Sequence, residues 1–255
     1  MKRILIGRKV YKLYDSIDEL PIVNFQKYNK YMLIDSGIGS DIDDVDRHIT
    51  QVAKYIKAGD QQSAIQELQN MRQNMYMIAS NISPKHLAFA ALIHSINGEV
   101  VTDLSDENLG RIIDEIKTAR RSWVIDLLLW LKKKIQDELE AYFPQEFVRA
   151  KDKEAYDKLK HRTELVLDSI INDKDNAEQI EHIDSAMLRL HKPKNFMGPT
   201  SEEIKYDKQF ESTCLLISQR TNQDARKMTV MQFYSTIENI KAQIEAENKA
   251  YSKYK

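Results

Sequence analysis

The stretch that decides the fold class is DIDDVDRHITQVAKYIKAGD, residues 41–60. Ser40 or Asp41 is suited to be a helix N-cap, because the oxygen of a short polar side chain accepts hydrogen bonds from the first backbone N–H groups of a helix. Gly59 then interrupts the pattern. Between them, apolar side chains recur at about the spacing of one helix face, at Ile42, Val45, Ile49, Val52, Tyr55 and Ile56. The stretch therefore predicts a helix over about 41–58.

The residues that follow predict more helix. The apolar spacing resumes at Ala64, so two antiparallel helices joined by a short turn are expected. A third, short helix over 87–96, opened by Pro84, is almost wholly apolar and is expected in the core. His86 and His94 would share a face of that helix, as packing residues or bonded to a nearby carbonyl group.

Outside this region, residues 3–14 alternate and are rich in β-forming side chains, which indicates a short N-terminal hairpin. The only long loop, 192–199, is the best linker candidate. Further helices are expected over about 21–37, 105–118, 119–143, 145–172, 177–191, 201–218 and 229–250. The predicted fold is mainly α, a multi-helix bundle of about nine helices with a small N-terminal β-hairpin. The expected domains are 1–143 (hairpin and helical core), 144–192 (charged helical hairpin) and 200–255 (C-terminal helical pair).

Composition supports long helices with few breaks. The 255 residues include only 7 glycines and 5 prolines, whereas average usage of the two together is about 12%. A β-sandwich needs a turn residue every few positions, and a dinucleotide-binding fold needs a glycine-rich loop. The shortage excludes both classes.

Charge and hydropathy exclude other classes. The 38 basic and 39 acidic residues leave a net charge of −1, so no overall field attracts nucleic acid or an anionic membrane. The longest apolar stretch, Trp123–Leu131, is about half of what a bilayer crossing needs. A basic band formed by Arg120, Arg121 and Lys132–Lys134 is typical of a solvated helix face, with nucleic-acid contact as the alternative.

The candidate sites for chemistry have simpler explanations. Asp41, Asp43, Asp44 and Asp46, with His48 close behind, could bind a cation, but acidic residues in a first helical turn are explained by the helix dipole. Gly37 and Gly39 precede a helix, where a tight turn is favoured over a phosphate site. Cys214 lies among leucines and is expected to be a buried, inert thiol. We predict no catalytic, cofactor-binding or metal-binding residues.

Four stretches carry a resemblance to a known group of proteins. Residues 11–22, 27–31, 35–46 and 88–98 resemble helical proteins encoded in the structural gene blocks of tailed phages that infect gut Bacteroidetes, the crAss-like phage group among them. Residues 228–234, followed by a charged helix, look like the end of phage tail-assembly proteins. The resemblance implies a neck or tail component of the virion, or a helper in tail assembly, and it transfers no active-site residues.

We therefore expect a non-enzymatic structural protein of a tailed bacteriophage virion, part of a neck or tail ring held by helix-mediated contacts between subunits. Its partners would be further copies of itself and other neck or tail proteins, with no membrane, nucleic acid, cofactor or small-molecule substrate. It would be assembled in the host bacterial cytoplasm and reside in the virion. Residues 145–172, 192–199 and 201–250 are the expected contact segments. The alternative is a tail-assembly chaperone that binds another tail protein transiently.

Overall fold

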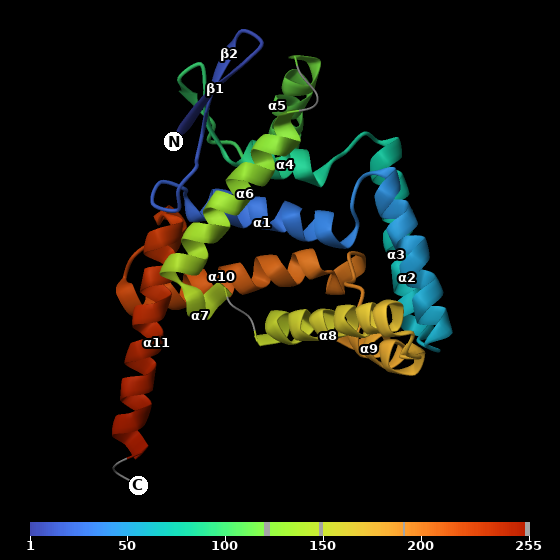
Figure 1. Cartoon of the computed structure of the whole chain (residues 1–255). Coiled ribbons are helices and arrows are strands. Elements are labelled where there is room, and N and C mark those ends of the chain that lie inside the picture. Colours follow the sequence, from blue (N-terminus) through green and yellow to red (C-terminus); the bar gives the residue numbers. More distant parts are fainter. Residues whose placement is uncertain (120–122, 148–149, 191, 253–255) are drawn as a thin grey trace. The chain divides into compact units, whose positions relative to one another are not determined.

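The computed structural model describes residues 1–119, 123–147, 150–190 and 192–252, and it divides the chain into two compact units (Figure 1). Both units are discontinuous in sequence. The first comprises Met1–Ser36, Ser83–Tyr142 and Met197–Lys255, and the second comprises Gly37–Ile82 and Phe143–Phe196. Every division falls at or next to a glycine or proline, namely Gly37, Pro84, Pro144 and Gly198. The scarce turn residues thus mark where the chain passes from one unit to the other.

The first unit contains an antiparallel sheet of four strands in the order β1-β2-β3-β4. The expected N-terminal hairpin is confirmed as β1 (Lys2–Ile6) and β2 (Lys9–Leu13). The helix predicted over 87–96 is wrong in its second half. It ends at Ala91, and β3 (Ile93–Ile96) and β4 (Glu99–Val100) form a second hairpin that pairs with β2.

Tertiary pairing explains this difference. The apolar run from 87 to 96 fits a buried strand as well as a buried helix, and β2 offers a free edge to which Ser95 and Ile96 pair. His94 consequently lies on a strand, and it does not share a helix face with His86. Its Nδ1 lies 2.9 Å from the hydroxyl oxygen of Tyr14.

The helices of the first unit surround a core built from α1, α4, α5 and α6 with the inner face of the sheet. Its fully buried side chains include Leu13, Phe89, Leu109 and Leu131. The helices are α1 (Ile22–Gly37), α4 (Pro84–Ala91), α5 (Asp106–Ala119), α6 (Trp123–Tyr142), α10 (Glu202–Thr221) and α11 (Val230–Ser252), with 3-10 turns η1 (Gly198–Thr200) and η2 (Ala225–Lys227).

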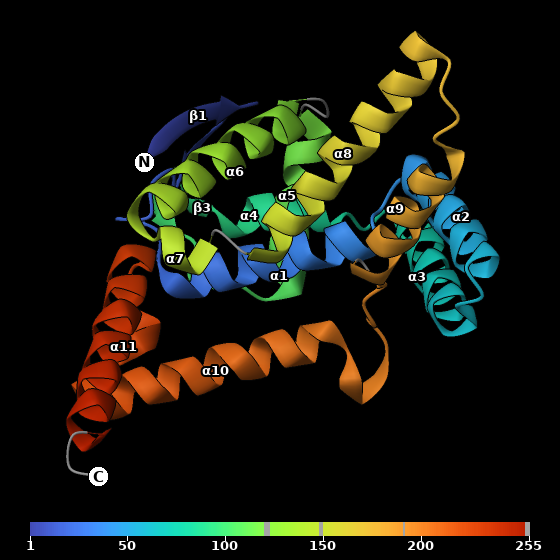
Figure 2. The same ribbon diagram turned by 60° about the horizontal axis from the view of Figure 1, so that its bottom comes forward.

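Two carboxylates attach α1 to its neighbours. Asp207 on α10 accepts hydrogen bonds from Gln26 at 2.7 Å and from Lys30 at 2.6 Å, and α10 runs alongside α1 in Figures 1 and 2. Asp106 on α5 accepts from Lys27 at 2.6 Å and from Tyr31 at 2.7 Å. Burial alone would raise the pKa of Asp106, but these two donors hold it below the usual value of an aspartate.

The second unit consists of two helical hairpins and one helical turn. The hairpins are α2 (Ile42–Lys57) with α3 (Gln61–Ala79), and α8 (Ala150–Asn172) with α9 (Ala177–Leu190); the turn is α7 (Pro144–Phe147). The guanidinium of Arg162 donates two hydrogen bonds to the carboxylate of Asp184, at 2.6 and 3.2 Å, and so joins α8 to α9.

The mainly α class is confirmed, and eleven α-helices lie in the part of the chain that the structure describes, slightly more than the nine expected. One addition is α7, which Pro144 begins as a separate turn before α8. No helix in this described part is both long enough and apolar enough to cross a bilayer.

Candidate interaction surface

The α2–α3 hairpin is defined by its ends. Asp41 accepts a hydrogen bond from the backbone N–H of Asp44 at 3.0 Å, and the Asp44 side chain bonds back to the N-cap backbone, which completes a capping box. Gly59, at φ +73°, makes the turn between the helices. Asp60 then caps α3 by accepting from the Ser63 N–H at 3.0 Å. Of the two residues predicted as N-cap, Ser40 and Asp41, it is Asp41 that caps α2, and the predicted break at Gly59 is confirmed.

The inner side of this hairpin is polar. The Nδ1 atom of His48 lies 2.7 Å from Oε1 of Glu67, and its Nε2 lies 2.7 Å from the carbonyl oxygen of Ile38. Asn74 donates to the same carbonyl at 3.1 Å. All three side chains are buried. Buried polar groups are retained only when they are hydrogen-bonded, so this cluster determines which side of the hairpin faces inward.

Hydrogen-bond roles at His48 follow from its partners. The Ile38 carbonyl can only accept, so Nε2 is the donor. The other ring nitrogen and the Glu67 carboxyl group share one further proton, whichever of the two atoms carries it. Both ring nitrogens of His48 are thus engaged by partners within the second unit.

The segment after α9 covers the same inner side. Asn70 on α3 donates to the carbonyl oxygen of Lys194 at 3.1 Å. Phe196 is buried against Gly37, where even a Cβ atom would collide with the edge of its ring. The 192–196 segment, predicted as a linker, is thus packed within the second unit. The boundary between the units follows it at 196/197.

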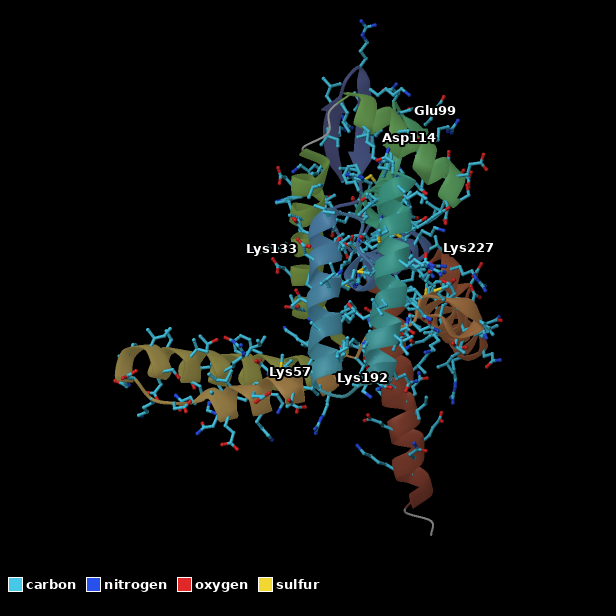
Figure 3. The ribbon with its side chains drawn as sticks, turned by 90° about the vertical axis from the view of Figure 1, so that its right-hand side faces the viewer. Lys57, Glu99, Asp114, Lys133, Lys192 and Lys227 are labelled. Atoms are coloured by element: carbon cyan, nitrogen blue, oxygen red, sulfur yellow. The ribbon has the colours of Figure 1, made fainter. Side chains whose placement is uncertain are left out.

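With its polar side inward, the hairpin directs its apolar side outward. On α2, Ile49 is 53% exposed and Ile56 is 63% exposed. On α3, Tyr76 is 63% exposed. Figure 3 shows α2 and α3 side by side, with Lys57 at the C-terminal end of α2. We refer to the following exposed side chains together as the α2–α3 outer face: Ile42, Ile49, Ile56, Ile65, Leu68, Met75 and Tyr76.

The second hairpin has the same property on α8. Its inner side, toward α9, holds Ala155 and Leu165 together with the Arg162–Asp184 ion pair. Its outer side is apolar and exposed, with Ile170 at 74%. We refer to Tyr156, Leu159, Leu167, Ile170 and Ile171 as the α8 outer stripe. The second unit thus carries exposed large apolar side chains on both of its hairpins.

The acidic cluster at the start of α2 is a helix cap. Asp41 and Asp44 form the capping box, whereas Asp43 and Asp46 are exposed to solvent. Within the residues whose positions are described, no three His, Cys, Asp or Glu side chains come close enough to hold a metal ion. The geometry of the cluster is that of acids stabilising the positive end of a helix dipole.

The remaining predicted features are placed as follows. Gly39, at φ +75°, lies against the Asp44 side chain and makes the tight turn before α2. Cys214 is buried in α10, and burial raises the pKa of its thiol. In the basic band, Lys132 and Lys133 are exposed and Lys134 donates to Asp15 at 3.0 Å, while residues 120–121 lie outside the described part.

Sequence reasoning missed the orientation of the hairpin. The apolar spacing predicted a helix with one apolar face on α2 and did not say whether that face is buried or exposed. A signal was present on α3, where Ser63, Glu67, Asn70 and Asn74 recur at helical spacing and form a second, polar stripe. A polar stripe on one helix and a histidine on its partner, His48, indicate a polar contact between them.

Comparison with known proteins adds no assignment, because no protein-family model, no curated protein and no solved structure matches this chain.

Proposed function

We propose that the chain is a non-enzymatic structural protein of a tailed bacteriophage particle, and that it forms part of a neck or tail ring through helix-mediated contacts between subunits. The observation that carries the proposal is the α2–α3 outer face. It is an apolar surface on a hairpin whose orientation is set by a buried polar cluster. The sequence resemblance to phage structural proteins supplies the biological setting.

The free energy that burial of the α2–α3 outer face would contribute supports a role in binding. Full burial of a large apolar side chain contributes about 1.5–3 kcal/mol. The seven side chains of the outer face are each roughly half exposed, so covering them contributes on the order of 5–10 kcal/mol before the cost of association. A chain that retains such a surface gains stability when another protein covers it.

The alternative, a tail-assembly chaperone, would use the same surfaces. An outward apolar face on two helices can receive an amphipathic helix of another protein. A ring protein stays in the finished particle, whereas a chaperone leaves it.

Mass spectrometry of gradient-purified particles and of the lysate from which they came separates the two functions. A ring protein is recovered in the particles in several copies relative to an internal peptide standard. Recovery from the lysate alone points to the chaperone. A chain that is absent from the particles and strictly monomeric at high concentration contradicts the ring.

A further inference from the structure

We propose that Asn97 is a site of spontaneous deamidation, and that the fold limits the reaction by holding Asn97 in a closed turn. The step from Asn97 to Gly98 is the only Asn–Gly in the chain. Both residues are exposed, so water, the co-reactant, reaches them. The inference is independent of the proposed ring function, because it concerns chemistry within the sheet of the first unit.

The reaction needs only these two residues and water. The backbone nitrogen of Gly98 loses its proton to solvent and forms a bond to Cγ of Asn97, an approach that no Cβ atom on a glycine obstructs. The side-chain nitrogen leaves Cγ as ammonia, which takes up a proton from solvent, and a five-membered succinimide ring remains.

Water then opens the succinimide at one of its two C–N bonds. Opening at Cγ gives aspartate. Opening at the main-chain carbonyl carbon gives isoaspartate, whose backbone contains one extra methylene group. In sum, one amide and one water become one carboxylate and one ammonium ion, with no oxidant or reductant.

Asn97 is held to β2 by two hydrogen bonds. Its backbone N–H donates to the carbonyl oxygen of Val10 at 2.8 Å, and its Oδ1 accepts from the Val10 N–H at 2.8 Å. The two bonds continue, by one residue, the pairing of β2 with β3 in which Tyr11 lies opposite Ile96. The side-chain carbonyl of Asn97 thus takes the place of a backbone carbonyl in the ladder.

The turn keeps the reacting atoms apart. Asn97 and Gly98 join β3 to β4 with φ angles of 51° and 95°, and two positive φ angles in a two-residue hairpin loop are those of a type I′ turn. The first residue of such a turn has ψ near +30°, which places the Gly98 nitrogen about 150° from Cβ of Asn97 in rotation about the Cα–C bond. A nearly flat succinimide ring needs these two atoms eclipsed.

Asn97 therefore reacts only when the turn opens. The required rotation redirects the chain at Gly98 and so breaks the pairing of β3 with β4. The two hydrogen bonds to Val10 stabilise the closed turn, so they lower the open fraction and with it the rate of deamidation.

The two products differ in their effect on the sheet. Aspartate keeps a backbone N–H and a side-chain oxygen in place for Val10. In isoaspartate the former side-chain carbonyl belongs to the main chain, and the turn is longer by one methylene group. The end of β2 at Val10 therefore loses its partner when isoaspartate forms.

Peptide mass spectrometry of the aged full chain tests the site. Asn222 is an internal control, since it is also exposed with a positive φ of 56°, but it precedes Gln223. In concentrated urea, Asn97 is expected to deamidate about an order of magnitude faster than Asn222, because glycine leaves the backbone nitrogen unobstructed. In the folded chain, Asn97 is expected to react about tenfold more slowly than in urea, or slower still.

Two substitutions at Val10 test the control by the fold. Val10→Pro removes the N–H that donates to Asn97, whereas the matched control Val10→Ala retains it. Folded Val10→Pro is expected to deamidate at Asn97 about fivefold faster than the wild type, which corresponds to the loss of one hydrogen bond. Folded Val10→Ala should match the wild type within about twofold, since it keeps that hydrogen bond.

Each result decides one part of the proposal. Equal rates for Asn97 and Asn222 in urea overturn the site. Equal rates for Asn97 in urea and in the folded chain overturn the control by the fold, and so does a Val10→Pro variant that reacts no faster than Val10→Ala. If circular dichroism shows that Val10→Pro does not fold, the comparison of folded and urea-treated wild type decides alone.

Hydrogen exchange tests the consequence for the sheet. The isoaspartate form, separated by chromatography from the aged sample, should exchange the amides of Lys9–Leu13 faster than fresh protein. The Asn97→Asp variant should exchange them like the wild type, which separates the added charge from the added methylene group. Equal exchange in the isoaspartate form and in fresh protein would overturn the loss of pairing at β2.

Discussion

Replacing His48 by leucine should destabilise the α2–α3 hairpin strongly, and a second substitution should restore it. His48 makes its two 2.7 Å contacts with Glu67 and with the Ile38 carbonyl. In the His48→Leu variant, the carbonyl keeps the Asn74 amide as a donor. Glu67, however, is left as a buried carboxylate without its partner.

The expected cost follows from this geometry. Removing one member of a buried ionic or strongly hydrogen-bonded pair costs about 3–5 kcal/mol, mostly because the other member stays buried. Replacing both members by apolar groups is often close to neutral. We therefore expect the double variant, His48→Leu with Glu67→Leu, to lie within about 1 kcal/mol of the wild type, which makes the coupling energy at least about 2 kcal/mol.

Hydrogen exchange followed by mass spectrometry measures the effect locally. Both tryptophans, Trp123 and Trp130, lie in the first unit, so tryptophan fluorescence does not report on α2 and α3. Peptides from these two helices should exchange about two to three orders of magnitude faster in the single variant, since 1.4 kcal/mol corresponds to a factor of ten.

Lys57→Ala is a suitable control, because its ion pair with Glu181 is mostly exposed and should change stability by less than about 1 kcal/mol. A loss below about 1 kcal/mol for His48→Leu would refute the reasoning. So would a double variant as unstable as the single one.

Three further predictions concern turns, caps and charge. Gly37→Ala should destabilise the second unit by roughly 1–3 kcal/mol, because the added methyl group collides with the Phe196 ring; an unchanged melting temperature would contradict this packing. Asp41→Ala should cost about 1 kcal/mol through loss of the N-cap, and Asp43→Ala, which removes a solvent-exposed acid, should cost less in the same urea titration. Burial raises the pKa of Glu203, so the stability that its protonated form contributes is present at low pH and is lost as pH rises through the folded-state pKa. Glu203→Gln should therefore be more stable than the wild type at pH 7 and equal to it near pH 3, and a pH-independent difference would contradict this.

Much of the fold could be predicted where local signals decide the structure. Asp41 and Gly59 lie at the two ends of α2, as their cap and turn chemistry predicts. The N-terminal hairpin is also local, since alternation and a two-residue turn specify it. At these positions the determining contacts lie within a few residues along the chain.

The rest depended on contacts between distant residues. Residues 93–96 became a strand because β2 presented a free edge eighty or more residues away in sequence. The polar side of the α2–α3 hairpin faces inward because His48 contacts Glu67 and the Ile38 carbonyl, and because Asn70 donates to the backbone carbonyl of Lys194. The apolar side therefore faces outward. Hydrophobic periodicity specifies that a helix has two unlike faces, and only tertiary partners decide which one is buried.

The most direct test of an outward, protein-binding face is the oxidation of Met75 by peroxide. Met75 is 54% exposed on the α2–α3 outer face, whereas Met228 is buried and serves as the slow reference. Peptide mass spectrometry gives the oxidation rate of each methionine in the dilute chain and in purified particles. We predict rapid oxidation of Met75 in the dilute chain and strong protection in the particle, with Met228 slow in both. Equal rates for Met75 in the two samples, or slow oxidation in the dilute chain, would contradict the account.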